Sequence, residues 1–177
     1  MKGLKGGILI NNAGKGHYLN PDAPDRLIRY VTRTNGKPSN DLIACGGAGV
    51  AEFTGTDGMI GQFHAVQGLH KRKGKFGRYA DHEVYSFSLD EERLIQENGL
   101  DVDGIARKMA YDFYERDNCQ VVYGVHKPDG ENGHLHVHFV VNTVDYATGG
   151  KRRENKRQTR ERQERFGLIV KEELEIS

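Results

Sequence analysis

The sequence predicts an α+β fold, in which a central, largely antiparallel sheet has helices packed on one face and an open cleft on the other. Residues 134–142 alternate: the even positions hold three histidines, Val140 and Asn142, and the odd positions are all apolar. Residues 82–89 alternate as well, and residues 102–117 carry apolar side chains at helical spacing. A two-residue period puts one face of a strand on a core, so the histidines should lie on the open face.

The other elements follow from local signals along the chain. Residues 6–11 read as a short strand, and prolines at positions 21 and 24 favour the start of a helix. The remaining expected elements are short strands at 42–45 and 49–53 around a Gly-Gly break, a helix at 57–69, a helical turn or two at 90–98 capped by Ser88, a strand at 119–125 and a charged helix at 152–166. This order is typical of an α+β sandwich.

Length and composition limit the class of protein. A chain of 177 residues is expected to form a single domain, residues 1–177. Its two cysteines, Cys45 and Cys119, have no paired spacing, which argues against a disulfide framework or a cysteine metal site. The apolar run at residues 8–10 is too short for a signal peptide or a membrane span. We therefore expect a cytoplasmic protein without membrane association.

Basic residues are concentrated in two blocks, although the formal net charge is only +1. Residues 71–78 hold five Lys or Arg and no acid, and residues 151–165 hold eight Lys or Arg against three Glu. Local blocks of this kind suggest a polyanion footprint. The alternative for the second block is a solvated, mixed-charge helix surface.

A three-histidine set is the strongest chemical signal. His126 ends the apolar run 121–125, and turn-forming residues at 128–133 separate it from the histidine-rich strand. A hairpin would bring His126 beside His136 and His138. Three neutral imidazoles on rigid strands make a divalent-metal site with positions left open for substrate. The alternative is a half-exposed polar strand face.

Several neighbours have possible supporting roles. His134 begins the same strand and is expected to be a neighbour or substrate contact instead of a ligand. His82 lies on the polar face of its own strand, where it is either a generic polar residue or a base near the metal. Glu83, Asp129 and Glu131 are alternative carboxylates for orienting a ligand histidine.

The motifs together resemble those of the conjugative relaxases, the mobilisation nucleases of plasmids and integrative elements. His136 and His138 flank one apolar residue and are followed by Asn142, with His126 upstream. Tyr30 stands in an Arg-Tyr-Val-Thr segment near the N-terminus. The order, tyrosine before histidines, fits the MobP-like type with a single motif-I tyrosine, within the His-hydrophobic-His (HUH) endonuclease superfamily. Replication initiators and related transposases have the reverse order.

The resemblance implies an HUH endonuclease-like fold and a site- and strand-specific nick at an origin of transfer. The Tyr30 hydroxyl would attack the scissile phosphate, leaving a 3′-hydroxyl and a 5′-phosphotyrosine that can be religated. His126, His136 and His138 would bind Mg²⁺ or Mn²⁺, with Zn²⁺, Ni²⁺ or Co²⁺ possible at the same site. A phenol is a weak nucleophile at neutral pH unless the phosphate is polarised or a base assists.

Two alternatives to Tyr30 as the nucleophile remain, namely Tyr18 and, because one relaxase lineage is thought to use histidine, His17. His82 is the candidate base. The expected DNA contacts, mostly to phosphates, are Arg29, Arg33, Lys71, Arg72, Lys73, Lys151, Arg152, Arg153, Lys156 and Arg157.

The resemblance also sets expectations for partners and context. The DNA partner would be single-stranded or a hairpin at the origin. Accessory relaxosome proteins and a coupling protein would be further partners of the protein. The enzyme would act in the bacterial cytoplasm and could enter a recipient cell with the DNA. The chain is expected to be the N-terminal, catalytic part of a longer protein.

Three rival functions are compatible with parts of the pattern. The first is a replication initiator or transposase-type nuclease of the same superfamily. The second is a non-nuclease enzyme or metal-binding protein with a three-histidine site, which needs neither Tyr30 nor the basic blocks. The third is a DNA-binding accessory module that has lost catalysis, against which the intact histidine set argues.

Overall fold

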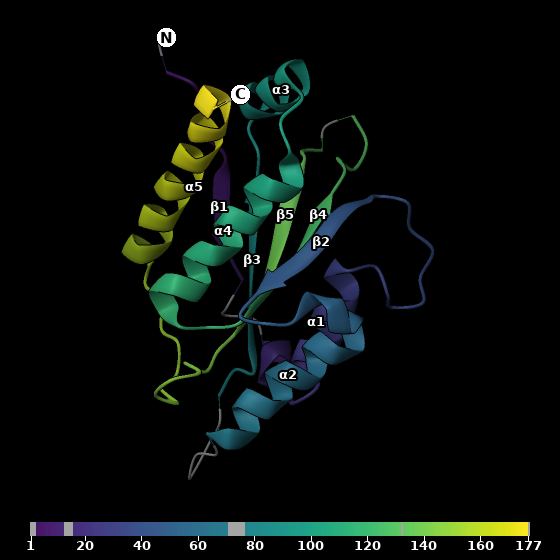
Figure 1. Ribbon diagram of the computed structural model, residues 1–177, viewed down its shortest axis with the longest axis vertical. Helices are drawn as coiled ribbons and strands as arrows, with labels where there is room; N and C mark the ends of the chain where they lie inside the picture. Colours follow the sequence, from purple (N-terminus) through teal and green to yellow (C-terminus); the bar gives the residue numbers. More distant parts are fainter. Residues whose placement is uncertain (1–2, 13–15, 71–76, 132, 177) are drawn as a thin grey trace.

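The computed structural model describes residues 3–12, 16–70, 77–131 and 133–176. Five strands form one sheet in which every neighbouring pair is antiparallel. In spatial order the strands are β1 (Ile8–Asn11), β3 (Ala80–Ser86), β5 (His136–Asn142), β4 (Val121–His126) and β2 (Leu42–Ala48). The predicted α+β fold with an antiparallel sheet is thus confirmed, and the histidine-rich strand β5 is its centre (Figure 1).

One face of the sheet is covered by α4 (Val102–Asp117) and α5 (Lys156–Ile176), which lie side by side in Figure 1. The main core forms there because the odd-numbered residues of β4 and β5 are apolar and point to these helices. Phe113 of α4 packs on Phe139 of β5 with ring centroids 5.1 Å apart and on Phe166 of α5 at 5.8 Å. α3 (Leu89–Asn98) borders this core. Ser88 caps the N-terminus of α3 through a full capping box with Glu91, and the sequence predicted Ser88 as the cap.

The histidine face is covered at one end only. There α1 (Ala23–Val31) and α2 (Gly55–Leu69) pack on the sheet and bury a second, smaller core with Val122 of β4 and Val140 of β5. At the other end, the same face of these strands carries histidines. Helices therefore lie on both faces, and the second pair leaves the histidine end of the sheet open.

Two local predictions were wrong. Strand β2 runs through the expected break at Gly46 and Gly47, and residues 52–54 form a short 3-10 helix, η2 (Glu52–Thr54), instead of a strand. A glycine is needed at position 46 because an added Cβ would lie 2.7 Å from the Tyr123 hydroxyl of the neighbouring strand. The glycine pair therefore marks close packing between strands and not a turn.

The charged C-terminal helix also differs from its predicted span. It begins at Lys156 and continues to Ile176, whereas residues 152–166 were expected. Phe166 and Val170, four residues apart, are both buried against the sheet, so packing extends the helix past 166. Within the described residues, no helix combines the length and apolar character needed to cross a membrane.

Candidate active site and metal centre

Three histidines meet at the open end of the sheet. The register pairs His126 of β4 directly with His136 of β5, and His138 lies two residues further along the same face. One ligand atom from each ring can be chosen so that all three lie within 4.8 Å of one another. The hairpin expected from the sequence thus brings the three predicted ligands together.

Hydrogen bonds to backbone carbonyls fix the tautomers of two of these rings. His126 Nε2 donates to the Val31 carbonyl at 2.8 Å, and His136 Nδ1 donates to the His134 carbonyl at 2.7 Å. Because a carbonyl only accepts, these nitrogens carry the protons of the neutral rings. His126 Nδ1 and His136 Nε2 are therefore left with lone pairs. A metal-binding imidazole needs this arrangement.

His138 completes the set through a different contact. Its Nδ1 lies 2.8 Å from His82 Nε2 on the neighbouring strand. Its Nε2 is buried and has no hydrogen-bond partner among the described residues. Burial first, and then the neighbouring imidazoles, lower the pKa of His138 to about 2, so the ring is neutral. A buried acceptor without a partner is costly, and a metal ion held by the three rings would satisfy it. The residues present therefore fit a metal ion.

Arg33 places a permanent positive charge beside the cluster. Its backbone has a φ of 56° just after α1, which turns the side chain back toward the histidines. The guanidinium is 3.2 Å from His126 Nδ1, 2.6 Å from an Asp41 carboxylate oxygen and 4.7 Å from the Tyr30 ring centroid. The Arg33 hydrogen bond holds the pKa of Asp41 well below its usual range.

Tyr30 is the tyrosine that faces the three histidines from the last turn of α1. Its ring centroid is 5.4 Å from that of His138 and 6.2 Å from that of His126. The side chain is 37 % exposed and borders an open cleft of about 330 Å³, which His136 and Asp129 also line. A phosphate in this cleft would meet both the phenol and the imidazoles.

The alternative nucleophiles lie differently. Tyr18 is 2 % exposed, and its hydroxyl is 3.3 Å from His82 Nδ1. Burial raises the pKa of Tyr18, which makes its phenolate harder to form. The side chain of His17 lies outside the described residues. The geometry therefore favours Tyr30 over Tyr18.

The expected carboxylate partners of the histidines are not those seen. Glu83 points to the opposite face of the sheet, where its carboxylate is 2.7 Å from Arg152. In the described part of the chain, Asp129 and Glu131 make no hydrogen bond to a ligand histidine. His82 and two backbone carbonyls take that role instead. The pattern-based reading missed Asp41 and the Val31 carbonyl, which only the tertiary structure brings to the site.

Arg152 must be removed from the candidate DNA contacts. Its side chain is 2 % exposed and pairs with Asp81 at 2.8 Å, Glu83 at 2.7 Å and Asp117 at 3.0 Å. Reaching DNA would break these buried ion pairs, which is strongly unfavourable. Arg152 is instead part of an interior charge network between the sheet and α5.

The other candidate DNA contacts fall into several groups. Arg33 lies beside the three-histidine cluster. Arg29 and Arg157 are ion-paired with Asp57 and Glu161 at the surface. Lys71, Arg72 and Lys73 lie outside the described residues. Lys151 is half-buried with its Nζ 2.7 Å from the Thr143 hydroxyl, whereas Arg153 and Lys156 are exposed.

Comparison with known proteins identifies the family. The nuclease-domain model of the MobA/VirD2-like relaxases matches residues 30–173. No curated protein sequence matches the chain. Among solved structures, the chain is similar to the metal-bound conjugative relaxase TrwC in complex with oriT DNA, at 14 % identity and a TM-score of 0.49 over 95 % of this chain and 68 % of that one. The family match covers most of the chain and confirms the predicted resemblance, so the chain belongs to the MobA/VirD2-like relaxase nuclease family.

Proposed function

We propose that this relaxase domain nicks one strand of DNA at an origin of transfer by attack of the Tyr30 hydroxyl on the scissile phosphate. The observation that carries this proposal is the exposed Tyr30 ring 5.4 Å from that of His138, beside the cluster of three imidazoles. The reaction forms a Tyr30 Oη–phosphorus bond and breaks the bond between phosphorus and the 3′-oxygen. The products are a 5′-phosphotyrosine and a 3′-hydroxyl.

His126 Nδ1, His136 Nε2 and His138 Nε2 are the atoms that would hold a divalent ion, Mg²⁺ or Mn²⁺, with Zn²⁺, Ni²⁺ or Co²⁺ as alternatives at the same site. A bound ion would polarise the scissile phosphate and offset the negative charge that develops on its non-bridging oxygens. The hydrogen bonds of the other ring nitrogens keep the three rings oriented for this task.

The neighbouring residues support the phenol and the phosphate. Arg33 lies over the Tyr30 ring, where its guanidinium can contact the phosphate. Both nitrogens of His82 already have hydrogen-bond partners in Tyr18 and His138. His82 therefore acts as a positioning residue, and the phenol proton leaves to solvent through the open cleft.

The phosphotyrosine explains why a tyrosine suits this task. It keeps the energy of the broken phosphodiester, so a 3′-hydroxyl can attack it and religate the strand. A hydrolytic nick would lose that energy. We propose religation as the second activity of the same site.

The DNA partner would be single-stranded, or a hairpin with a single-stranded arm, because the cleft is open and the strand must reach the sheet surface. Exposed cations such as Arg153 and Lys156 would contact phosphates. Accessory relaxosome proteins, a coupling protein, action in the bacterial cytoplasm and transfer with the DNA remain part of the proposal.

The test is formation of a covalent protein–DNA adduct. The protein is incubated with Mn²⁺ and single-stranded oligonucleotides that tile the presumed origin, and adducts are resolved on a denaturing gel. Tyr30→Phe and His136→Ala should each abolish the adduct, and Tyr18→Phe, the matched control, should retain it. An adduct that survives Tyr30→Phe contradicts the assigned nucleophile. Metal binding without cleavage of any tile would favour the non-nuclease alternative.

A further inference from the structure

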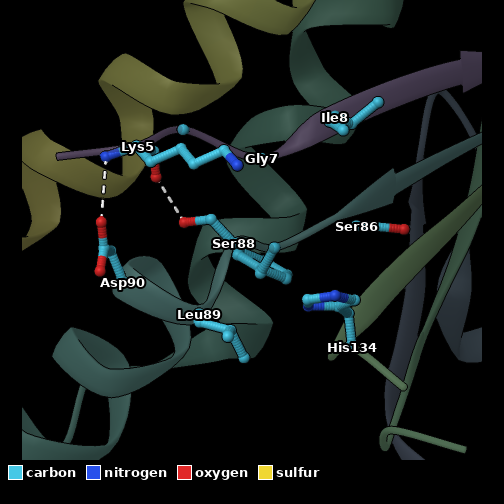
Figure 2. A pocket seen from close by; sticks show the side chains of 10 residues that line it. Lys5, Gly7, Ile8, Ser86, Ser88, Leu89, Asp90 and His134 are labelled. Carbon is cyan, nitrogen blue, oxygen red and sulfur yellow. Dashed lines mark hydrogen bonds between the residues drawn. The ribbon is translucent and has the colours of Figure 1, made fainter. Parts of the chain in front are cut away.

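A second cavity, of about 440 Å³, lies at the edge of the sheet between the segment leading into β1, the end of β3 and the first turn of α3 (Figure 2). Apolar side chains of Ile8, Phe87 and Leu89 line it. Ile8 is 56 % exposed and Leu89 is 66 % exposed, so both offer apolar surface to a ligand. The described histidine cluster lies outside this cavity.

The cavity adjoins the cleft at the three histidines. Ser86 and His134 line both spaces, and Ser86 is the register partner of the metal-site residue His136. A DNA strand whose scissile phosphate lies at the histidines would therefore bring an adjacent nucleotide to this cavity. Figure 2 shows the His134 ring among the residues that line this cavity, with Ser86 and Leu89 on either side of it in the view.

The lining suits a nucleobase. His134 lies two residues before β5, and its side chain is 42 % exposed, so part of the imidazole ring is open to a ligand. Aromatic and imidazole rings stack on unpaired bases without strong sequence preference. Apolar side chains around the ring would cover the rest of the base.

The charge at the rim suits the nucleotide's phosphate. Among the described residues, the exposed Lys5 makes no salt bridge. Asp90 is the acid in the lining, and it accepts from the Lys5 backbone nitrogen at 3.2 Å and pairs with Arg93 at 3.0 Å. The Asp90 charge is therefore offset by Arg93, and the Lys5 ammonium can meet a phosphate.

We propose that this cavity holds the base of a nucleotide adjacent to the scissile phosphate, stacked on the His134 ring and flanked by Leu89 and Ile8. The proposal rests on the nuclease function proposed above. It gives His134 a substrate-binding role that is distinct from the metal-binding role of His136 and His138.

The test measures coupling between one side chain and one base. A Tyr30→Phe parent, which should not cleave, is titrated with a fluorescent oligonucleotide that spans the nick site in the presence of Mn²⁺. Single abasic sites replace each nucleotide around the nick in turn. In the parent, one abasic position next to the nick should weaken binding about tenfold. His134→Ala should weaken binding of the intact strand to a similar extent, and the same abasic site should then have little further effect.

Additional variants separate stacking from folding. His134→Phe should restore binding of the intact strand, because it keeps a flat ring. Leu89→Asp should weaken binding, although an acid is favourable in the first turn of a helix. Phe53→Asp, which puts the same charge on a 93 % exposed side chain in η2, should bind like the parent. Alanine at 134 keeps the carbonyl that accepts from His136, so the Mn²⁺ affinity of that variant reports whether the cluster is intact.

The outcomes distinguish this subsite from the proposed function. If the protein with Tyr30 forms the adduct but abasic effects are equal in the parent and in His134→Ala, the subsite is refuted and the nuclease function stands. If the protein forms no adduct and binds no oligonucleotide, both proposals fail.

Discussion

His82 and His138 are joined by a 2.8 Å contact between Nε2 of the first ring and Nδ1 of the second. The contact leaves His138 Nε2 as the nitrogen that points into the three-histidine cluster, where it is buried without a hydrogen-bond partner among the described residues. His82 is in turn 3.3 Å from the Tyr18 hydroxyl. His82, held by Tyr18, thus orients the His138 ring, a role that the sequence analysis gave to a carboxylate.

Loss of His82 should weaken metal binding. His82→Ala removes the hydrogen bond that orients His138, and such outer partners change metal affinity by about 10- to 100-fold. His82→Gln, whose amide oxygen can accept from Nδ1, should recover part of the affinity. Isothermal titration with Mn²⁺ measures both, with Tyr18→Phe as the control that removes only the outer contact. Equal affinities in wild type and His82→Ala would refute the positioning role.

Arg33 should affect metal binding and catalysis in opposite directions. Its guanidinium lies 3.2 Å from His126 Nδ1, where it repels a cation and competes for the lone pair. The same charge lies over the Tyr30 ring, where it can contact the scissile phosphate. Arg33→Gln should therefore raise Mn²⁺ affinity several-fold and slow single-turnover adduct formation. A decrease in both quantities would indicate a purely structural role.

The pH dependence of stability should report on Glu83. Burial raises the pKa of this carboxyl to about 8, although Arg152 opposes the shift. A carboxyl with a raised folded-state pKa stabilises the fold most below its unfolded pKa. That contribution is lost as the pH rises from about 4.5 toward 8. Glu83→Gln mimics the protonated form, so its stability relative to wild type should increase over this range.

Urea unfolding of both metal-free proteins at several pH values measures this difference. Comparing the two proteins cancels the titration of histidines that they share. A stability difference that does not change between pH 5 and 8 would mean that Glu83 is charged throughout.

Arg152 and Arg153 are adjacent but should behave differently. Arg152→Ala removes the guanidinium that contacts the buried Glu83 and leaves Asp81 and Asp117 with one arginine partner each, which should cost about 3 to 5 kcal/mol of stability. Arg153→Ala should leave stability nearly unchanged and reduce the salt dependence of DNA binding by about one phosphate contact. Unfolding curves and binding titrations at several salt concentrations measure the two effects. Equal salt slopes for Arg153→Ala and wild type would remove Arg153 from the DNA surface.

The parts of the fold that were predictable depend on local pattern. The alternation around His136 and His138 shows which side chains share a face, and Ser88 with Glu91 forms a cap from residues three apart. The contacts that complete the site join distant segments. The His126–Val31 hydrogen bond spans 95 positions, and no periodicity reports it.

The prediction for Arg152 failed for the same reason. A run of basic residues in the sequence predicts a solvent-exposed surface. The acidic side chains that contact Arg152 come from β3 and the end of α4. Only the tertiary structure brings those acids together. Arg33 was assigned to DNA from the sequence, and its position 3.2 Å from His126 Nδ1 was not predictable, because a positive φ brings its side chain back to the histidines.

The most direct test of the proposed chemistry is to identify the residue that carries the DNA. The adduct is digested with nuclease and trypsin, and the nucleotide-bearing peptide is sequenced by mass spectrometry. Cleavage after Arg26, Arg29 and Arg33 puts Tyr30 on peptide 30–33 or 27–33, whereas Tyr18 and His17 are both on peptide 16–26. We predict the nucleotide on Tyr30. A nucleotide on peptide 16–26 would contradict attack by the tyrosine that faces the three histidines.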